Sequence, residues 1–121
     1  MEVTLYEKNG QPTAYIADDD ENSIYSWTGH AMAYLYDDKV YGWNGKHLGW
    51  FVDGIIYNLS GLRNGFTKDK CPVAPYASPA KYAKYAKYAK YARFAAYARS
   101  ALSASASNES LMDLLESGKA G

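Results

Sequence analysis

A short motif that occurs four times in the first 70 residues constrains the fold more than any other feature of the chain. Each copy holds a glycine between aromatic residues, and these glycines are Gly10, Gly29, Gly45 and Gly61. Successive glycines are separated by 19, 16 and 16 residues. Repetition at this spacing indicates small supersecondary units that bury one another, so the repeated unit determines the architecture.

The repeated unit has the pattern of a β-hairpin. A polar residue precedes each glycine, as in Asn9-Gly10 and Asn44-Gly45, and β-branched and aromatic residues lie on both sides. Asn-Gly between such residues is the strongest short signal for a two-residue hairpin loop, because both residues tolerate a positive φ. We therefore predict four β-hairpins with two-residue loops.

Two-residue loops place an aliphatic residue of each first strand opposite a small residue of the second strand. The pairs are Leu5 with Ala14, Ile24 with Ala33, Val40 with Gly49, and Ile56 with Gly65. Small partners let neighbouring hairpins approach closely, so we assign this face to the centre of the fold. The tyrosines and tryptophans then form an outer, half-buried layer. Three-residue loops would change the partners.

The segment 40–51 and its copies resemble the 4-fold β-flower proteins, a family of short bacterial proteins. The resemblance covers residues 1–70 and extends to a tail of Lys/Tyr triplets and to the segment 109–113. It implies a mainly β fold with four hairpins arranged like petals about a pseudo-fourfold axis. It implies no assigned activity and identifies no functional residues. The tail departs from the family pattern, because alanine occupies triplet positions where proline or serine is expected.

Composition divides the chain into a hairpin domain at 1–70, a proline-rich junction at 71–79, a Lys/Tyr/Ala-rich stalk at 80–107 and a short amphipathic helix at 108–118. The hairpin domain has ten acidic and six basic residues, whereas the remainder has three acidic and seven basic residues. The tail therefore either folds back on the acidic domain or offers a basic patch to a partner.

The stalk repeats Lys-Tyr-Ala four times between residues 81 and 92. A period of three fits a polyproline II helix, which aligns the lysines on one edge and the tyrosines on another. Alanine and lysine nevertheless favour an α-helix, and Ser78-Pro79 fits its N-cap and first helical position. We predict an α-helix from Ala80 to Ala104 that forms fully only on contact with another surface.

A second, shorter helix is predicted near the C-terminus. Asn108 fits its N-cap, Glu109 to Glu116 its body, and Gly118 its end. Its apolar side consists of Leu111, Leu114 and Leu115. A helix this short is marginal alone, so we expect it to dock on its own domain or on another protein.

Two further sets of side chains are candidate binding residues. A candidate aromatic surface consists of Trp27, Trp43, Trp50, Tyr25 and Tyr41. Aromatic rings at a surface suit carbohydrate, whereas the simpler interpretation is that these rings cover a small core. A candidate charge-driven site consists of Lys81, Lys84, Lys87, Lys90 and Arg93. Interleaved cations and aromatic rings suit single-stranded nucleic acid or an anionic membrane surface, and a solvated stalk is the alternative.

The sequence has no Ser/His/Asp order, no phosphate-binding glycine loop and no zinc-ligand spacing. We therefore predict no catalytic residues, no cofactor and no metal site. Cys71 is the only cysteine, and neither a signal peptide nor a long apolar run is visible. We expect a soluble, cytoplasmic protein, with signal-independent export as the open alternative.

These observations together predict a non-enzymatic protein-interaction module. It would have a rigid hairpin head, a basic aromatic stalk and a terminal helix that docks on another protein. Carbohydrate or cell-envelope binding through the aromatic face is one alternative. Nucleic-acid binding through the Lys/Tyr tail is another, and homo-oligomers are compatible with so small a domain.

Overall fold

The computed structural model describes residues 1–120, which contain eight β-strands and one short α-helix. The strands are β1 (Val3–Tyr6), β2 (Pro12–Ile16), β3 (Ser23–Ser26), β4 (Ala31–Tyr36), β5 (Lys39–Gly42), β6 (His47–Val52), β7 (Ile55–Asn58) and β8 (Arg63–Phe66). The helix, α1, spans Leu111–Glu116. Consecutive strands pair as four hairpins, which confirms the predicted mainly β fold.

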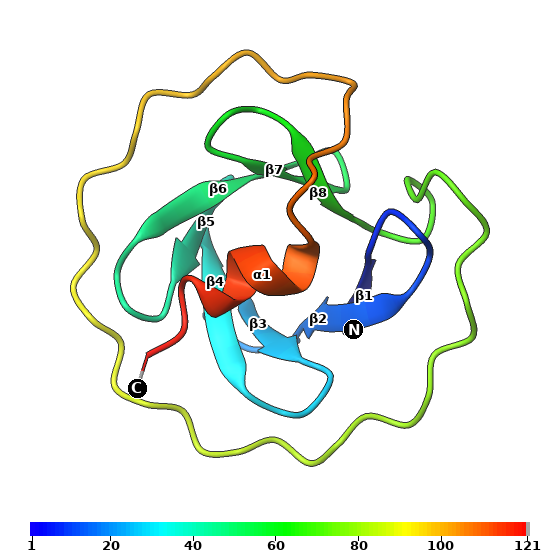
Figure 1. The fold of residues 1–121 in the computed structure, drawn as a ribbon. Helices are drawn as coiled ribbons and strands as arrows, with labels where there is room; N and C mark the ends of the chain where they lie inside the picture. Colours follow the sequence, from blue (N-terminus) through cyan, green and yellow to red (C-terminus); the bar gives the residue numbers. More distant parts are fainter. Residues whose placement is uncertain (121) are drawn as a thin grey trace.

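The four hairpins close into an eight-stranded antiparallel barrel. Each hairpin also pairs with the next one along the chain, and β1 meets β8 at Tyr6 and Phe66 to complete the circle. Figure 1 shows the hairpins spread like petals around an axis, with α1 lying across the middle of the barrel. No helix of the described residues is long and apolar enough to cross a membrane.

The hairpin loops have three residues, and the prediction of two-residue loops is wrong. In the first hairpin the Glu7 N–H donates to the Gln11 carbonyl (2.9 Å) and the Gly10 N–H donates to the Glu7 carbonyl (2.9 Å). The same two bonds recur in the other three hairpins. Only the glycine of each loop has a positive φ, between 82° and 99°. This pattern is typical of a three-residue loop that ends in a left-handed glycine.

The predicted strand partners are nevertheless correct, because a bulge compensates for the extra loop residue. The register shifts between Leu5 and Tyr6, and Leu5 consequently lies opposite Ala14. Equivalent shifts in the other hairpins place their aliphatic residues opposite Ala33, Gly49 and Gly65. One extra residue per bulge thus returns the small residues to the inner face.

The inner face forms the aliphatic core, as the sequence predicts. Leu5, Ile24, Val40 and Ile56 are fully buried, together with Ala14 and Ala33. The leucines of α1 complete the same cluster from one end of the barrel. Leu111 lies against Gly65, where a Cβ atom would be only 2.8 Å from a leucine methyl carbon. The helix therefore fits because the small position of the repeat is a glycine there.

Residues 72–104, which we call the belt, contain no helix and no strand. The predicted α-helix from Ala80 to Ala104 is therefore wrong. Figure 1 shows that the belt runs around the outside of the barrel and encircles it. An α-helix would turn successive triplets about 60° away from one another, so its lysines would not all face one surface. The extended chain, with its period of three, turns every lysine of the triplets towards the barrel.

Candidate interaction surface

One type of backbone bond between the belt and the barrel recurs every nine residues, and Tyr82 and Tyr91 add bonds to the carbonyl oxygens of Trp27 (3.3 Å) and Trp43 (3.0 Å). The N–H groups of Tyr76, Tyr85, Phe94 and Ser103 donate to the carbonyl oxygens of Gly10, Gly29, Gly45 and Gly61, each at 2.9 Å. These glycines occupy the same loop position in the four hairpins. Nine residues are three triplets, so the triplet repeat matches the spacing of the petals and brings the same edge of the belt to each loop.

The loop glycines are required for this attachment as well as for the turns. A Cβ atom on Gly29 would lie 2.2 Å from the carbonyl oxygen of Ala83, and one on Gly45 would lie 2.3 Å from that of Ala92. The equivalent distance at Gly61 is 2.2 Å, to Ala101. Real Cβ atoms do not approach backbone oxygen so closely. The repeated glycine therefore serves both the left-handed turn and the close approach of the belt.

The lysines of the triplets point inward and form ion pairs with the barrel. Lys81 and Lys84 share the carboxylate of Glu2, at 2.8 and 3.0 Å. Lys87 contacts Asp19 and Glu21, both at 2.9 Å. Lys90 contacts the second oxygen of Glu21 at 2.8 Å. The basic tail is thus folded back on the acidic hairpin domain, which is one of the two outcomes that the charge distribution predicts.

These ion pairs change the acidity of their carboxylates. Burial opposes ionisation of Asp19, but hydrogen bonds from Ser23 and Lys87 outweigh it and lower the pKa of Asp19 to about 2. Hydrogen bonds from Lys81 and Lys84 lower the pKa of Glu2. The belt is therefore held partly by carboxylates, whose negative charge is lost when they are protonated in acid.

The same lysines cover aromatic rings of the barrel. The Lys81 ammonium lies 4.6 Å from the centre of the Tyr15 ring, and that of Lys90 lies 4.3 Å from the Tyr34 ring. The Arg93 guanidinium lies 3.7 Å from the centre of the Tyr36 ring. Such cation–π contacts are favourable where both groups are partly desolvated. Each lysine consequently has two kinds of partner on the barrel.

The belt covers most of the candidate aromatic surface. Tyr25, Tyr41, Trp43 and Trp50 are between 2 and 4 % exposed, and only Trp27 is half-buried. The Trp43 indole N–H donates to the carbonyl oxygen of Tyr88 in the belt. The structure therefore corrects the expectation of an exposed or half-buried layer for four of these five residues. They form a second core between the barrel and the belt.

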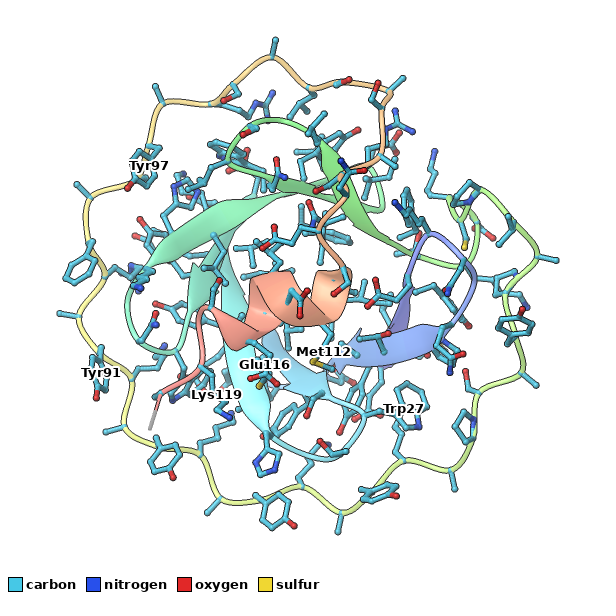
Figure 2. The ribbon with its side chains drawn as sticks, in the orientation of Figure 1. Trp27, Tyr91, Tyr97, Met112, Glu116 and Lys119 are labelled. Carbon is cyan, nitrogen blue, oxygen red and sulfur yellow. The ribbon has the colours of Figure 1, made fainter. Side chains whose placement is uncertain are left out.

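The outward side of the belt carries a row of exposed aromatic side chains. Its members are between 58 and 65 % exposed and are Tyr76, Tyr82, Tyr85, Tyr88, Tyr91, Phe94 and Tyr97. Figure 2 shows Tyr91 and Tyr97 at the periphery, whereas Trp27 lies between its hairpin and the belt. The inward lysines thus separate a buried aromatic layer from an exposed one. We call the exposed residues the tyrosine row.

His47 binds the belt at Tyr97, the last residue of the tyrosine row. It is buried, and its Nδ1 accepts a hydrogen bond from the Tyr97 N–H (3.0 Å) while its Nε2 lies 2.9 Å from the Gly49 carbonyl oxygen. This arrangement uses the neutral ring with its proton on Nε2. Burial lowers the pKa of His47, which agrees with that form. The imidazole has no free nitrogen for proton transfer.

The terminal helix docks on its own barrel. Leu111, Leu114 and Leu115 are at most 5 % exposed, so the structure shows the first of the two predicted alternatives, docking on the chain's own domain, and these leucines are not available to another protein. The N-cap is Ser110, whose hydroxyl accepts the Asp113 N–H (3.0 Å), and not Asn108. The Glu7 carboxylate also accepts the N–H groups of Leu111 (2.8 Å) and Met112 (3.0 Å). Figure 2 shows Met112 and Glu116 on this helix at the centre of the molecule.

Within residues 1–120, no three His, Cys, Asp or Glu side chains are grouped in a way that would hold a metal ion. Cys71 is half-buried and unpaired. Charge-driven binding through Lys81, Lys84, Lys87, Lys90 and Arg93 stays a prediction. A phosphate group at these residues would have to compete with Glu2, Asp19 and Glu21, which already occupy them.

Two parts of this surface are absent from the sequence-based list of site residues. The exposed tyrosines belong to a recognised repeat, but the nine-residue match to the hairpins is visible only in the structure. His47 and Glu7 have no signal in the sequence. Their partners, Tyr97 and the start of α1, lie 50 and 104 residues away in the sequence.

No curated protein and no solved structure matches this chain. The chain does match a family described as 4-fold beta flower protein over residues 3–115, which includes the barrel, the belt and nearly all of α1. The match agrees with the four hairpins around one axis, and it extends through the segments that lie outside the barrel strands. This chain belongs to the 4-fold beta flower protein family.

Proposed function

We propose that this protein is a non-enzymatic interaction module that binds a protein partner through the tyrosine row. The observation that carries the proposal is the division of roles within the belt. Its lysines are occupied by the barrel, whereas seven aromatic side chains, each more than half exposed, face solvent. Exposed apolar surface of several hundred Å² on a soluble protein is typical of interaction sites.

The chemistry of the row favours a protein as the partner. Tyrosine combines a large apolar ring with a hydroxyl group, and it is enriched in the cores of protein interfaces. Nucleic acid depends on free positive charge, and Lys81, Lys87 and Lys90 already have carboxylate partners. Carbohydrate binding through Trp43 and Trp50 would require the belt to move away from them.

The size of the row indicates how a partner would engage it. A tyrosine side chain that is about three-fifths exposed offers roughly 100–150 Å². The whole row adds up to about 800 Å², the area that each protein contributes to an interface of standard size, but this area is distributed around the barrel because the belt encircles it. A stable partner would have to contact several triplets along the belt. Because the belt is already ordered, little conformational entropy is lost on binding.

The test replaces four members of the row with serine: Tyr82, Tyr85, Tyr88 and Tyr91. The matched control replaces Lys81, Lys84, Lys87 and Lys90 with glutamine in the same triplets. Affinity capture from native lysate at low and high salt, followed by mass spectrometry, identifies what each variant retains. We expect the serine variant to remain folded and to lose specific protein partners at both salt concentrations. Retention of the same proteins by the folded serine variant would contradict the proposal. The proposal would also be contradicted if the native chain captures nucleic acid and only the glutamine variant fails to do so.

A further inference from the structure

The pseudo-fourfold symmetry is broken at the junctions between hairpins, and one junction is open. At the first junction, between β2 and the loop of the next hairpin, the Trp27 N–H donates to the Thr13 carbonyl (3.0 Å). At the second, the Trp43 N–H donates to the Met32 carbonyl (3.1 Å). The equivalent residues at the third junction are Leu59 and Leu48, and the described part of the chain has no such bond between them.

The fourth junction is also open between the hairpins, but the chain fills it. The Arg63 N–H donates to the Ser105 carbonyl (2.9 Å), and the Arg63 carbonyl accepts the Ser107 N–H (2.8 Å), as the chain passes from the belt to α1. At the third junction no segment enters, and a hollow of about 590 Å³ remains. A volume of this size is typical of small-molecule sites.

The cause of the hollow is a change of residue type at one repeat position. The second and third hairpins have Trp27 and Trp43 at the loop position where the fourth hairpin has Leu59. Trp43 is 2 % exposed and fills its junction with an indole ring, whereas the smaller Leu59 lines an open space. The second junction therefore shows that an indole ring fits such a space.

The contacts of Trp43 define what a ligand ring would meet. The Trp43 indole N–H donates to the carbonyl oxygen of Tyr88, and its ring packs edge-on against Tyr34 at 5.5 Å. The residue nine positions after Tyr88 on the belt is Tyr97, which lines the hollow together with Leu48 and Leu114. Leucine side chains and an aromatic belt residue form a surface suited to a planar ring.

The charged side chains that line the hollow are Lys46 and Glu109, and the Glu109 carboxylate accepts a hydrogen bond from the Asn64 amide (3.4 Å). Lys46 lines the hollow, and none of the ion pairs among residues 1–120 includes it. The lysines of the belt differ, because each of the four has a carboxylate partner. A carboxylate on the ligand would therefore find an available ammonium group at the edge of the hollow.

We propose that the hollow at the third junction binds a small indole carboxylate. The ring occupies the space that tryptophan fills at the preceding junction, its N–H donates to the Tyr97 carbonyl, and its carboxylate pairs with Lys46. This site lies on a different part of the molecule from most of the tyrosine row, and the inference stands independently of the proposed function.

The experiment is a titration of the full chain with indole-3-acetate, followed by two-dimensional NMR of backbone amides and methyl groups. We expect saturable shifts at Leu48, Leu59 and Leu114. The N-methylated analogue, which lacks the N–H, should bind about two- to tenfold more weakly. Absence of saturation, or shifts confined to other parts of the protein, would overturn the proposal.

Two substitutions test the roles of individual residues. Leu59→Trp should fill the hollow from within, abolish binding and raise the midpoint of thermal unfolding. Lys46→Met should weaken indole-3-acetate binding several-fold and leave the weaker binding of uncharged indole unchanged, whereas Lys68→Met should alter neither. Undiminished binding to a folded Leu59→Trp variant would contradict the site. If the Leu59→Trp variant does not fold, the NMR shifts of the native chain test where the ligand binds. Equal weakening of indole and indole-3-acetate binding by Lys46→Met would contradict the assigned ion pair.

Discussion

The barrel strands pair with one another, whereas the belt pairs only with the barrel. Every barrel strand has a hydrogen-bonded strand on each side, and the aliphatic residues between them exclude water. The belt has no such ladder, and its order comes from isolated backbone bonds to the hairpin loops together with ion pairs and cation–π contacts. The two regions therefore have different sources of stability, and changes in each should have different consequences.

A truncation in the barrel core should have the largest effect and should disorder both regions. Ile56 is fully buried beside the helix leucines. Ile56→Ala removes buried carbon and leaves a cavity, so we expect the free energy of unfolding to fall by about 2–5 kcal/mol. Chemical denaturation measures this change. Loss of belt order alone, with the barrel unaffected, would show that the belt does not depend on the barrel.

A methyl group at the junction of the two regions should have the next largest effect. Gly45→Ala strains a φ of 89° and brings a Cβ atom against the Ala92 carbonyl. We expect a loss of about 1–3 kcal/mol and faster hydrogen exchange at Phe94. Gly54→Ala is the control, because its φ is also positive (78°) but its neighbours are side chains of Thr67 and Lys70. If the Phe94 amide is equally protected in both variants, the close approach of the belt to Gly45 does not contribute to the order of the belt.

Acid should loosen the end of the belt near His47. Because burial lowers the pKa of His47 below its ordinary value of 6.5, the neutral ring stabilises the folded state above about pH 6.5. This stability is lost as the pH falls through the lowered pKa, since protonation of Nδ1 removes its bond from Tyr97. Lys39 and Asp38 are the charged groups that also act on this ring. We expect the protection factor of the Tyr97 amide, which corrects for the intrinsic pH dependence of exchange, to decrease as the pH falls below 6.5 in the native protein. In His47→Gln this protection factor should not depend on pH in that range.

Loss of a single inward lysine should have the smallest effect. Lys87→Met removes the ammonium group that joins Asp19 and Glu21, and its side chain is 29 % exposed. Partly exposed ion pairs contribute about 0.2–1 kcal/mol, so we expect a decrease in that range that becomes smaller at high salt. Thermal unfolding at two salt concentrations measures it. The matched variant is Lys119→Met, whose ion pair with Glu116 does not hold the belt.

The hairpins and their inner face were predictable because their signals are local. The repeat identifies four turns, and alternation along each strand assigns Leu5 and Ala14 to one face. The loop length was not predictable from Asn-Gly, because this dipeptide also fits a three-residue loop in which only the glycine is left-handed. A bulge in each hairpin then restores the predicted pairing, such as that of Leu5 with Ala14.

The belt was predicted as a helix because local propensity favours one, and tertiary contacts override it. The partners of Lys87 lie 66 and 68 residues away, and no propensity contains that information. The alternative based on a period of three describes the side-chain arrangement correctly. The decisive quantity is the length of three triplets, which matches the distance between neighbouring hairpin loops. This match appears only when the hairpins are placed around an axis.

Hydrogen exchange of the belt amides tests most directly whether the tail is a belt attached to each petal. The account predicts protected amides at Tyr76, Tyr85, Phe94 and Ser103, separated by nine residues, and also at Tyr82, Tyr91 and Tyr97, which donate to Trp27, Trp43 and His47. In the described chain, Ala77, Ala86 and Ala95 donate to no group of the barrel and should exchange fast. Uniformly fast exchange from residue 76 to residue 103 would show a detached tail. Continuous protection with helical circular dichroism would show an α-helix, and either result would contradict the account.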